Sequence, residues 1–361
     1  MSSLSIYDNK AINKNYEFYN DLLNSSKVLS KDIGEKFNNL LFNSVEKLVR
    51  PLIENTMKSA QADTLDPTQS LQAEIDQKNN PGILKIPPGN YGVINVNKNL
   101  RLTAADSNNP PHIQRINAIN VSRFYVDNIT IGNPNLSAGA VKNLPESEIG
   151  IRVVIKDDEN VDIGINNSRI LGVADGISIS SSHPTKNTEN QRITINGNTI
   201  SNIQRDGINL KNVGQYAITR NTIHSIHPNY EDTNYTNLRK ASNAPDAAVV
   251  LPNGVMAQHA DGIQATNAKG GVISGNKFSI GNGTWYQAIN VHHEADSPYR
   301  HLATEPVRIQ NNTIQNNHDF AISVKHFNIS NASANNNNIR AQAVDKRKEL
   351  STMSVLKETL Q

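Results

Sequence analysis

The chain has 361 residues, a formal net charge of +2, 37% hydrophobic residues and no cysteine. This composition excludes a disulfide framework and thiolate chemistry, and the small net charge argues against a nucleic-acid binder, which would carry clustered Lys and Arg. No apolar run approaches the roughly 20 residues that span a bilayer, so no membrane span is expected.

Residues 1–75 are expected to form a helical N-terminal segment and cap. Up to about residue 60, hydrophobic side chains recur at helical spacing, among them Leu22, Leu23, Leu40 and Leu41. These helices would cap a repeat, form a homo-oligomer or serve in secretion. Residues 61–71 predict a linker into a short helix with Asp66 or Thr68 as its N-cap, because either side chain can accept a backbone N–H.

A strand, a Pro-Gly turn and a second strand are predicted over residues 84–96. The segment from Leu84 to Tyr91 reads Leu-Lys-Ile-Pro-Pro-Gly-Asn-Tyr, and a strand pattern continues from Val93 to Val96. This beginning resembles the first coil of pectate-lyase-like right-handed parallel β-helices and of phage tailspikes. The resemblance covers residues 84–340 and implies an all-β, single-stranded solenoid.

An internal repeat supports the same fold. One strand recurs around a small residue followed by isoleucine, as in Ile149-Gly-Ile151, Gly176-Ile177, Gly207-Ile208, Gly262-Ile263, Ala288-Ile289 and Ala321-Ile322. A second element has asparagine at a fixed place, at Asn198, Asn221, Asn276, Asn312 and Asn337. We expect the isoleucines to stack inward on coils about 4.8 Å apart. We also expect the asparagines to adopt the left-handed conformation and to bond in a ladder.

The repeat also sets the expected domain limits, with the β-helix over 76–340 and an amphipathic helix over 341–361. The step from Gly207 to Gly262 is 55 residues, longer than the other steps. It predicts an inserted loop at about 227–258 that contains Arg239.

With the isoleucines inward, the outward positions form three rows along the solenoid. The rows are Asp175, Asp206, Asp261 and Gln287; Ser178, Asn209, Gln264, Asn290 and Ser323; and Ser180, Lys211, Thr266, His292 and Lys325. The aspartates have two interpretations, because Asp before Gly often bonds its own turn. Alternatively, carboxylates one coil apart need a cation, a base or a shared proton, and they would then mark a site.

The histidines are the candidate acids and bases, because an outward imidazole titrates near neutral pH. We expect His259, Asp261 and His292 to share one solvent-facing groove, with Asp206 and Lys325 as further catalytic candidates. Solvated or turn-bonding histidines are the alternative. Zinc at His292, His293 and Glu294 is disfavoured, because alternation would point one histidine away.

The candidate substrate-binding residues surround these groups. The lysines would neutralise an acidic sugar and the aromatic residues would stack on sugar rings, although surface or packing roles are equally open. The set is Lys211, Gln264, Asn290, Tyr286, Trp285, Arg239 and Arg300.

Three functions remain open, all with a polysaccharide as the partner. The first is a lyase that cleaves an acidic, uronate-containing bacterial exopolysaccharide by β-elimination. It would need no cofactor, or Ca²⁺ held by Asp206, Asp261 and Glu294. The second is a glycoside hydrolase using Asp206 and Asp261, or an epimerase.

The third function is a non-catalytic carbohydrate-binding or attachment protein. The resemblance implies any of the three, since this fold carries many activities. An extracellular or cell-surface location is expected although the first residues lack a signal-peptide pattern, with the cytoplasm as the alternative.

Overall fold

In the computed structural model the chain divides into two units, residues 1–61 and 62–361. The structure describes residues 63–64, 70–77, 82–155, 160–181, 191–228, 260–279, 287–292, 306–315, 320–325, 333–335 and 337–340. The helices expected within 1–60 and 341–361, and nearly all of the expected insertion, lie outside these residues. The described part of the second unit is mostly β-structure, built from long parallel sheets.

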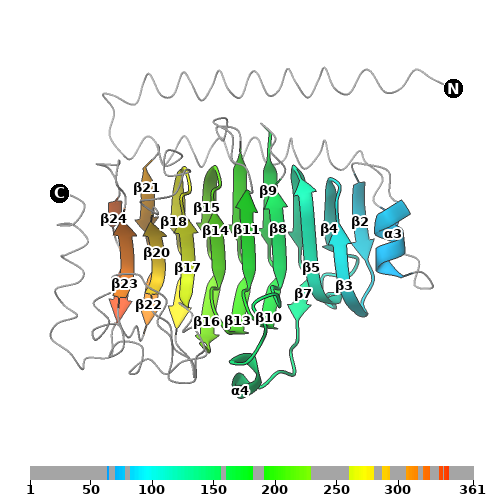
Figure 1. The fold of residues 1–361 in the computed structure, drawn as a ribbon, viewed down its shortest axis with the longest axis horizontal. Helices are drawn as coiled ribbons and strands as arrows, with labels where there is room; N and C mark the ends of the chain where they lie inside the picture. Colours follow the sequence, from blue (N-terminus) through cyan, green and yellow to red (C-terminus); the bar gives the residue numbers. More distant parts are fainter. Residues whose placement is uncertain are drawn as a thin grey trace. The chain divides into compact units, whose positions relative to one another are not determined.

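Sheet A contains ten parallel strands (Figure 1). In order across the sheet they are β1 (Asp63–Thr64), β2 (Gly82–Ile86), β4 (Leu100–Ala104), β6 (Arg123–Asp127), β9 (Asp162–Asn166), β12 (Arg192–Asn196), β15 (Gln215–Thr219), β18 (Gly270–Ser274), β21 (Val307–Gln310) and β24 (Ser333–Asn335).

Sheet B has fifteen strands in two arms that meet at β5 (His112–Val121), which also pairs with β3 (Asn90–Val96). The first arm contains β8 (Ile151–Ile155), β11 (Ile177–Ser181), β14 (Ile208–Lys211), β17 (Asp261–Thr266), β20 (Gln287–His292) and β23 (Phe320–Lys325). The second arm contains β7 (Thr130–Gly132), β10 (Arg169–Val173), β13 (Thr199–Ile203), β16 (Thr222–Ile226), β19 (Lys277–Ser279), β22 (Thr313–Gln315) and β25 (Asn338–Arg340).

From β6 onward the chain visits sheet A, the second arm and the first arm in turn, and then returns to sheet A one strand further on; before β6 it passes between sheet A and β3 or β5. One such round is called a circuit below. The aligned isoleucines are register partners from Ile151 through Ile177, Ile208, Ile263 and Ile289 to Ile322, which confirms the repeat. The second repeated element is not one strand, because Asn198 lies at a turn between β12 and β13. From β6 onward each circuit therefore contains three strands, whereas the circuits β2–β3 and β4–β5 contain two.

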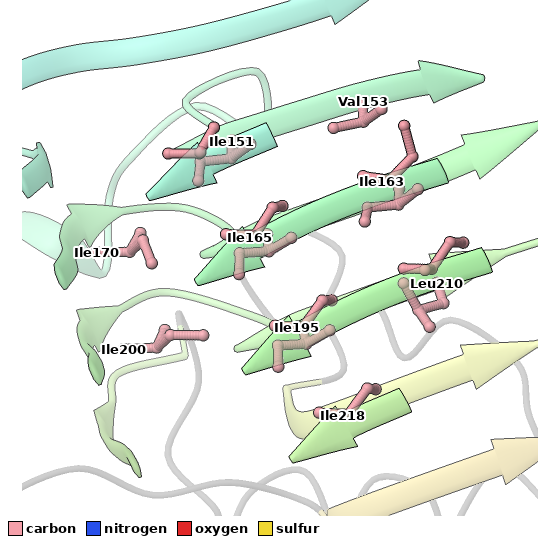
Figure 2. Packing of buried hydrophobic residues seen from close by; sticks show 14 of the residues in the cluster. Ile151, Val153, Ile163, Ile165, Ile170, Ile195, Ile200, Leu210 and Ile218 are labelled. Atoms are coloured by element: carbon pink, nitrogen blue, oxygen red, sulfur yellow. The ribbon is translucent and has the colours of Figure 1, made fainter. Parts of the chain in front are cut away.

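The core lies between the sheets and consists of stacked isoleucine, leucine and valine side chains. Figure 2 shows Ile165, Ile195 and Ile218 of sheet A one above another, facing the interior that Ile151 and Leu210 of the first arm also enter. Burying each such side chain contributes about 1.5–3 kcal/mol. This regular stack holds the strands in register and fixes which side chains point outward.

The turns between sheet A and the second arm carry the expected asparagine ladder. Oδ1 of Asn221 accepts the backbone N–H of Asn198 at 2.9 Å, and Oδ1 of Asn276 accepts that of Asn221 at 3.0 Å. The same bond continues through Asn312 to Asn337. The expected left-handed conformation is wrong for these residues, because the preceding residue adopts it, as in Arg220 with φ of 56°.

Helix α3 (Leu71–Gln77) covers the first circuit, with Leu71 and Ile75 buried. Its N-cap is Ser70, whose Oγ accepts the N–H of Ala73, so the expectation of Asp66 or Thr68 is wrong. The side-chain amide of Gln72 accepts from and donates to the backbone of Asn95, the way a neighbouring strand would. The edge strand β3 is thereby paired.

The segment between β7 and β8 leaves the stack and includes the short helix α4 (Ala138–Val141), seen projecting beyond the ends of β10 and β13 in Figure 1. Asn202 and Gln204 donate side-chain hydrogen bonds to the carbonyls of Leu136 and Lys142. Arg115 binds Glu148 at 2.7 Å. These contacts hold the segment 133–150, called the excursion below, beside the turns that lead into the first arm.

Candidate functional site

Strand register sets two adjacent rows of residues along the first arm. The amide row begins at Asn95 of β3 and Asn117 of β5 and continues in the first arm with Arg152, Ser178, Asn209, Gln264, Asn290 and Ser323. The basic row contains Ser180, Lys211, Thr266, His292 and Lys325. Both rows follow the expected order, with members about 4.8 Å apart from one circuit to the next.

Exposure varies along each row. Lys211 is exposed, whereas Asn209, Gln264 and His292 are partly buried. Asn290 and Thr266 are only 7% and 4% exposed, although alternation places them on the side away from the core. Nε2 of His292 lies 3.5 Å from Oγ1 of Thr266, its neighbour in the basic row. Among the described residues of the two rows, Asn95, Arg152 and Lys211 are the exposed ones.

The aspartate row is buried, which corrects the expectation that these side chains face solvent. Asp175, Asp206 and Asp261 are 2%, 5% and 0% exposed. The rule of alternating faces does not apply to them, because Asp175 and Asp206 lie in turns and Asp261 is the first residue of its strand. The neighbouring circuits cover them instead.

The aspartates form a second ladder, in which each carboxylate bonds the next circuit. Oδ1 of Asp175 accepts the backbone N–H of Asp206 at 3.2 Å. Oδ1 of Asp206 accepts that of Asp261 at 2.9 Å, and Oδ1 of Asp261 accepts that of Gln287 at 3.1 Å. The turn-bonding interpretation therefore describes these contacts, with the bond running between circuits rather than within one turn.

The second oxygen of each carboxylate binds a side chain. Arg205 donates Nη2 to Oδ2 of Asp175 at 2.6 Å and Nε to Oδ1 at 2.9 Å. Asn209 donates Nδ2 to Oδ2 of Asp206 at 2.8 Å, and Asn290 donates Nδ2 to Oδ2 of Asp261 at 3.0 Å. The aspartate ladder is therefore joined to the amide row.

Arg205 is a cation beside this ladder and was not among the site residues predicted from the sequence. It also binds Glu146 of the excursion at 3.0 Å. An arginine stands before Asp-Gly in one circuit only, so the repeat gives no signal for it. Lys211 and Lys325, chosen from the sequence, lie in the basic row instead.

Burial raises the pKa of the Asp175 and Asp206 carboxyls. The pKa of Asp206 is raised well above its usual value, first by burial and then by the negative charges of Asp175 and Asp261. The N–H of Asp261 and the Arg205 guanidinium oppose that rise. Burial also raises the pKa of Asp175 despite its bond to Arg205.

Asp261 does not face solvent as expected, and it lies at the other end of the strand register from His292. Asp261 begins β17, and His292 is the register partner of Thr266 at the end of that strand. Five residues at about 3.3 Å each separate the two positions by roughly 16 Å. The structure brings Asp206 beside Asp261 and places Lys211, His292 and Lys325 in one row, but the two groups lie along opposite margins of the arm.

Six predicted site residues lie outside the described part of the chain, namely His259, Arg239, Trp285, Tyr286, Glu294 and Arg300. Lys325 lies in β23, but its side chain is not described. Within the described residues, no cluster of three His, Asp or Glu is arranged to hold a metal ion. Asp206 and Asp261, two of the three residues expected to bind Ca²⁺, use their oxygens in the ladder.

Comparison with known proteins gives no match to a family model, a curated protein or a solved structure. Within the described ranges, no helix is long and apolar enough to cross a membrane.

Proposed function

We propose that residues 76–340 form a right-handed parallel β-helix of the pectate-lyase-like type. The three-strand circuits, the all-parallel sheets and the ladder of asparagines support this proposal. The hand follows from the general rule that connections between parallel strands of one sheet are right-handed.

We infer that the outward face of the first arm binds an acidic polysaccharide, which the chain cleaves as a lyase at the cell surface or outside the cell. The observation that carries the proposal is the pairing of an amide row with a basic row at a constant spacing. Side-chain amides hydrogen-bond sugar hydroxyls, while Lys211 and Lys325 would supply positive charge for carboxylates. A repeating polymer laid along the rows would meet one polar residue of each row at each circuit.

The chemistry that this face favours is β-elimination. His292, as neutral imidazole, would remove the proton beside the uronate carboxylate. The electron pair forms the carbon–carbon double bond and the glycosidic oxygen leaves, taking a proton from water. Lys325, the register partner of His292, would neutralise the carboxylate while charge develops on it.

A hydrolase is less well supported, because it needs one carboxyl to protonate the leaving oxygen and a second to attack or to activate water. Asp206 and Asp261 are almost completely buried, and their carboxylate oxygens accept hydrogen bonds within the protein. A lyase using the basic row does not require either carboxylate to reach the substrate.

The test measures binding and cleavage of polygalacturonate, alginate and hyaluronate by the full chain, with neutral dextran for comparison. We expect salt-sensitive binding of at least one acidic polymer and a rise in the ultraviolet absorbance of the unsaturated uronate. Lys211→Ala should weaken binding about fivefold, since a hydrogen bond to a charged group is lost. Lys277→Ala, which removes an outward lysine of the second arm, is the matched control and should bind normally.

The other outcomes separate the alternatives. New reducing ends without unsaturated product would indicate a hydrolase, and binding without either would indicate an attachment protein. Loss of activity in EDTA would indicate that a metal ion, rather than Lys325, neutralises the uronate carboxylate. Equal binding to dextran and the acidic polymers, or none to any of them, would overturn the proposed ligand class.

A further inference from the structure

The buried aspartates control the orientation of two amides on the proposed binding face. Nδ2 of Asn209 donates to Asp206 at 2.8 Å and to Oε1 of Gln264 at 3.1 Å. A primary amide has two N–H donors, so both donors of Asn209 are engaged within the protein. Asn290 repeats the contact one circuit beyond Gln264, donating Nδ2 to Asp261 at 3.0 Å.

Once ionised, at a pH above its raised pKa, the Asp206 carboxylate only accepts hydrogen bonds, and this property fixes the amide. Turning Asn209 over would place its Oδ1 against Oδ2 of Asp206 and would lose the bond to Gln264. Holding both donors inward leaves Oδ1 as the atom of Asn209 available to a ligand. Within the described residues, no hydrogen bond engages that oxygen.

We infer that Asp206 and Asp261 are positioning residues that make Asn209 and Asn290 present oxygen acceptors to the ligand. The inference rests on the proposed function of this face and names its specificity. The ligand must place hydroxyl donors, rather than ether or carboxylate oxygens, against these two positions. Asn209 is the stronger of the two contacts, because Asn290 is 7% exposed.

The chain contains its own comparison in the preceding circuit. Asp175 occupies the same ladder, but the outward residue in its circuit is Ser178, and its carboxylate is held by Arg205. A change at Asp175 therefore disturbs the ladder without releasing an amide. Asp175→Asn is the control that separates ladder damage from amide orientation.

The variant that tests the inference is Asp206→Asn. Its Oδ1 can still accept the N–H of Asp261, which places the new NH₂ group where Oδ2 stood. Two donors would then face each other, so Asn209 should turn over and expose its own NH₂ group. The neutral side chain also removes repulsion from Asp175 and Asp261, so the protein should remain folded.

The first measurement needs no ligand. In the full chain labelled with ¹⁵N-asparagine, the side-chain NH₂ signals of Asn209 are those that Asn209→Ala removes. We expect them to exchange slowly with water in the unmodified chain and in Asp175→Asn, and at least tenfold faster in Asp206→Asn, where the NH₂ faces solvent. Unchanged exchange in Asp206→Asn would overturn the inference.

The second measurement is a double-mutant cycle with the acidic polymer that binds most tightly in the panel above. Asn209→Ala and Asp206→Asn should each weaken binding about fivefold. The double variant should bind no more weakly than Asn209→Ala, because Asp206 acts through Asn209. Additive losses, or full affinity in Asp206→Asn, would overturn the inference.

The two measurements distinguish the failures. If the Asn209 amide exchanges faster in Asp206→Asn but no polymer of the panel binds the chain, the positioning of the amide is upheld and the proposed function is overturned. If an acidic polymer binds but the exchange of the Asn209 amide is unchanged in Asp206→Asn, the proposed binding is upheld and the positioning of the amide is overturned.

Discussion

The asparagine and aspartate ladders run along the same stack of circuits, but they use their hydrogen bonds differently. Each ladder asparagine accepts the backbone N–H of the preceding circuit, as Asn221 does from Asn198. Each aspartate accepts that of the following circuit, as Asp206 does from Asp261. Both ladders therefore satisfy turn N–H groups that would otherwise be buried without partners.

The remaining atoms explain the difference. Nδ2 of Asn221 donates to the carbonyl of Ile195 and to Asn276, so the asparagine is saturated within its own ladder and neutral. The second oxygen of Asp206 binds an outward amide instead, and its charge is opposed by two neighbours. The asparagine ladder therefore stabilises the stack of circuits. The aspartate ladder contains repelling buried charges, which lower stability, but it connects the turns to the amide row.

The largest effect is expected from a substitution that puts an aspartate into the asparagine ladder. Asn221→Asp is isosteric, but it directs an oxygen at two acceptors, Ile195 O and Asn276 Oδ1, which lie 2.9 and 3.0 Å from the present Nδ2. We expect the free energy of unfolding to fall by about 4 kcal/mol at pH 7, because buried groups lose their partners. Urea denaturation measures the loss, which should shrink at pH 4 as the new carboxyl gains a proton.

The control is Asn117→Asp on the outward side of β5, where Asn117 makes one side-chain bond to Asn95. A loss below about 1 kcal/mol is expected there. If both substitutions cost the same, the asparagine ladder would not be the saturated, neutral array described above.

The second effect probes how closely the circuits approach at the aspartate ladder. A Cβ on Gly207 would lie 2.5 Å from the carbonyl oxygen of Gly262 and 2.9 Å from Cγ2 of Ile223. We expect Gly207→Ala to lower the free energy of unfolding by about 3 kcal/mol, since backbone must move. Gly92→Ala, with no atom within 4 Å, should change it by less than about 1 kcal/mol in chemical denaturation. Equal costs would mean that the spacing at the aspartates is not set by glycine.

A smaller effect concerns pH. The pKa of Asp206 is raised in the folded state, so the folded chain holds this proton to higher pH than the unfolded chain. Its contribution to stability is present below the unfolded pKa and is lost as pH rises through the folded pKa. Asp175, Asp261 and Arg205 are the charged groups that shift it, and Glu146 contacts Arg205.

Asp206→Asn should therefore remove part of this decline. We expect the variant to match or slightly trail the unmodified chain at pH 4 and to exceed it at pH 8 in urea midpoints. A variant less stable than the unmodified chain at both pH values would show that the charged form of Asp206 stabilises the fold.

The strands of the first arm could be predicted from sequence because their isoleucines alternate and recur beside a small residue. The second arm could not, because its strands are short and contain a left-handed residue, such as Asn202 with φ of 51°, that interrupts alternation. The buried aspartates were misplaced because alternation was extended from Ile208 into the turn before it. The distance from Asp261 to His292 could have been estimated from the rise per residue of a strand.

The smallest expected effect is on the outward amide itself. Asn209→Ala removes one hydrogen bond from Asp206 and one from Gln264, but Asn209 is partly exposed, and water can replace both. We expect a loss of about 0.5 kcal/mol, measured by urea denaturation, against several kcal/mol for a ladder asparagine such as Asn276→Ala. A small loss also means that weaker polymer binding by this variant reports the missing amide rather than unfolding. A loss equal to that of Asn276→Ala would instead place Asn209 among the groups that hold the circuits together.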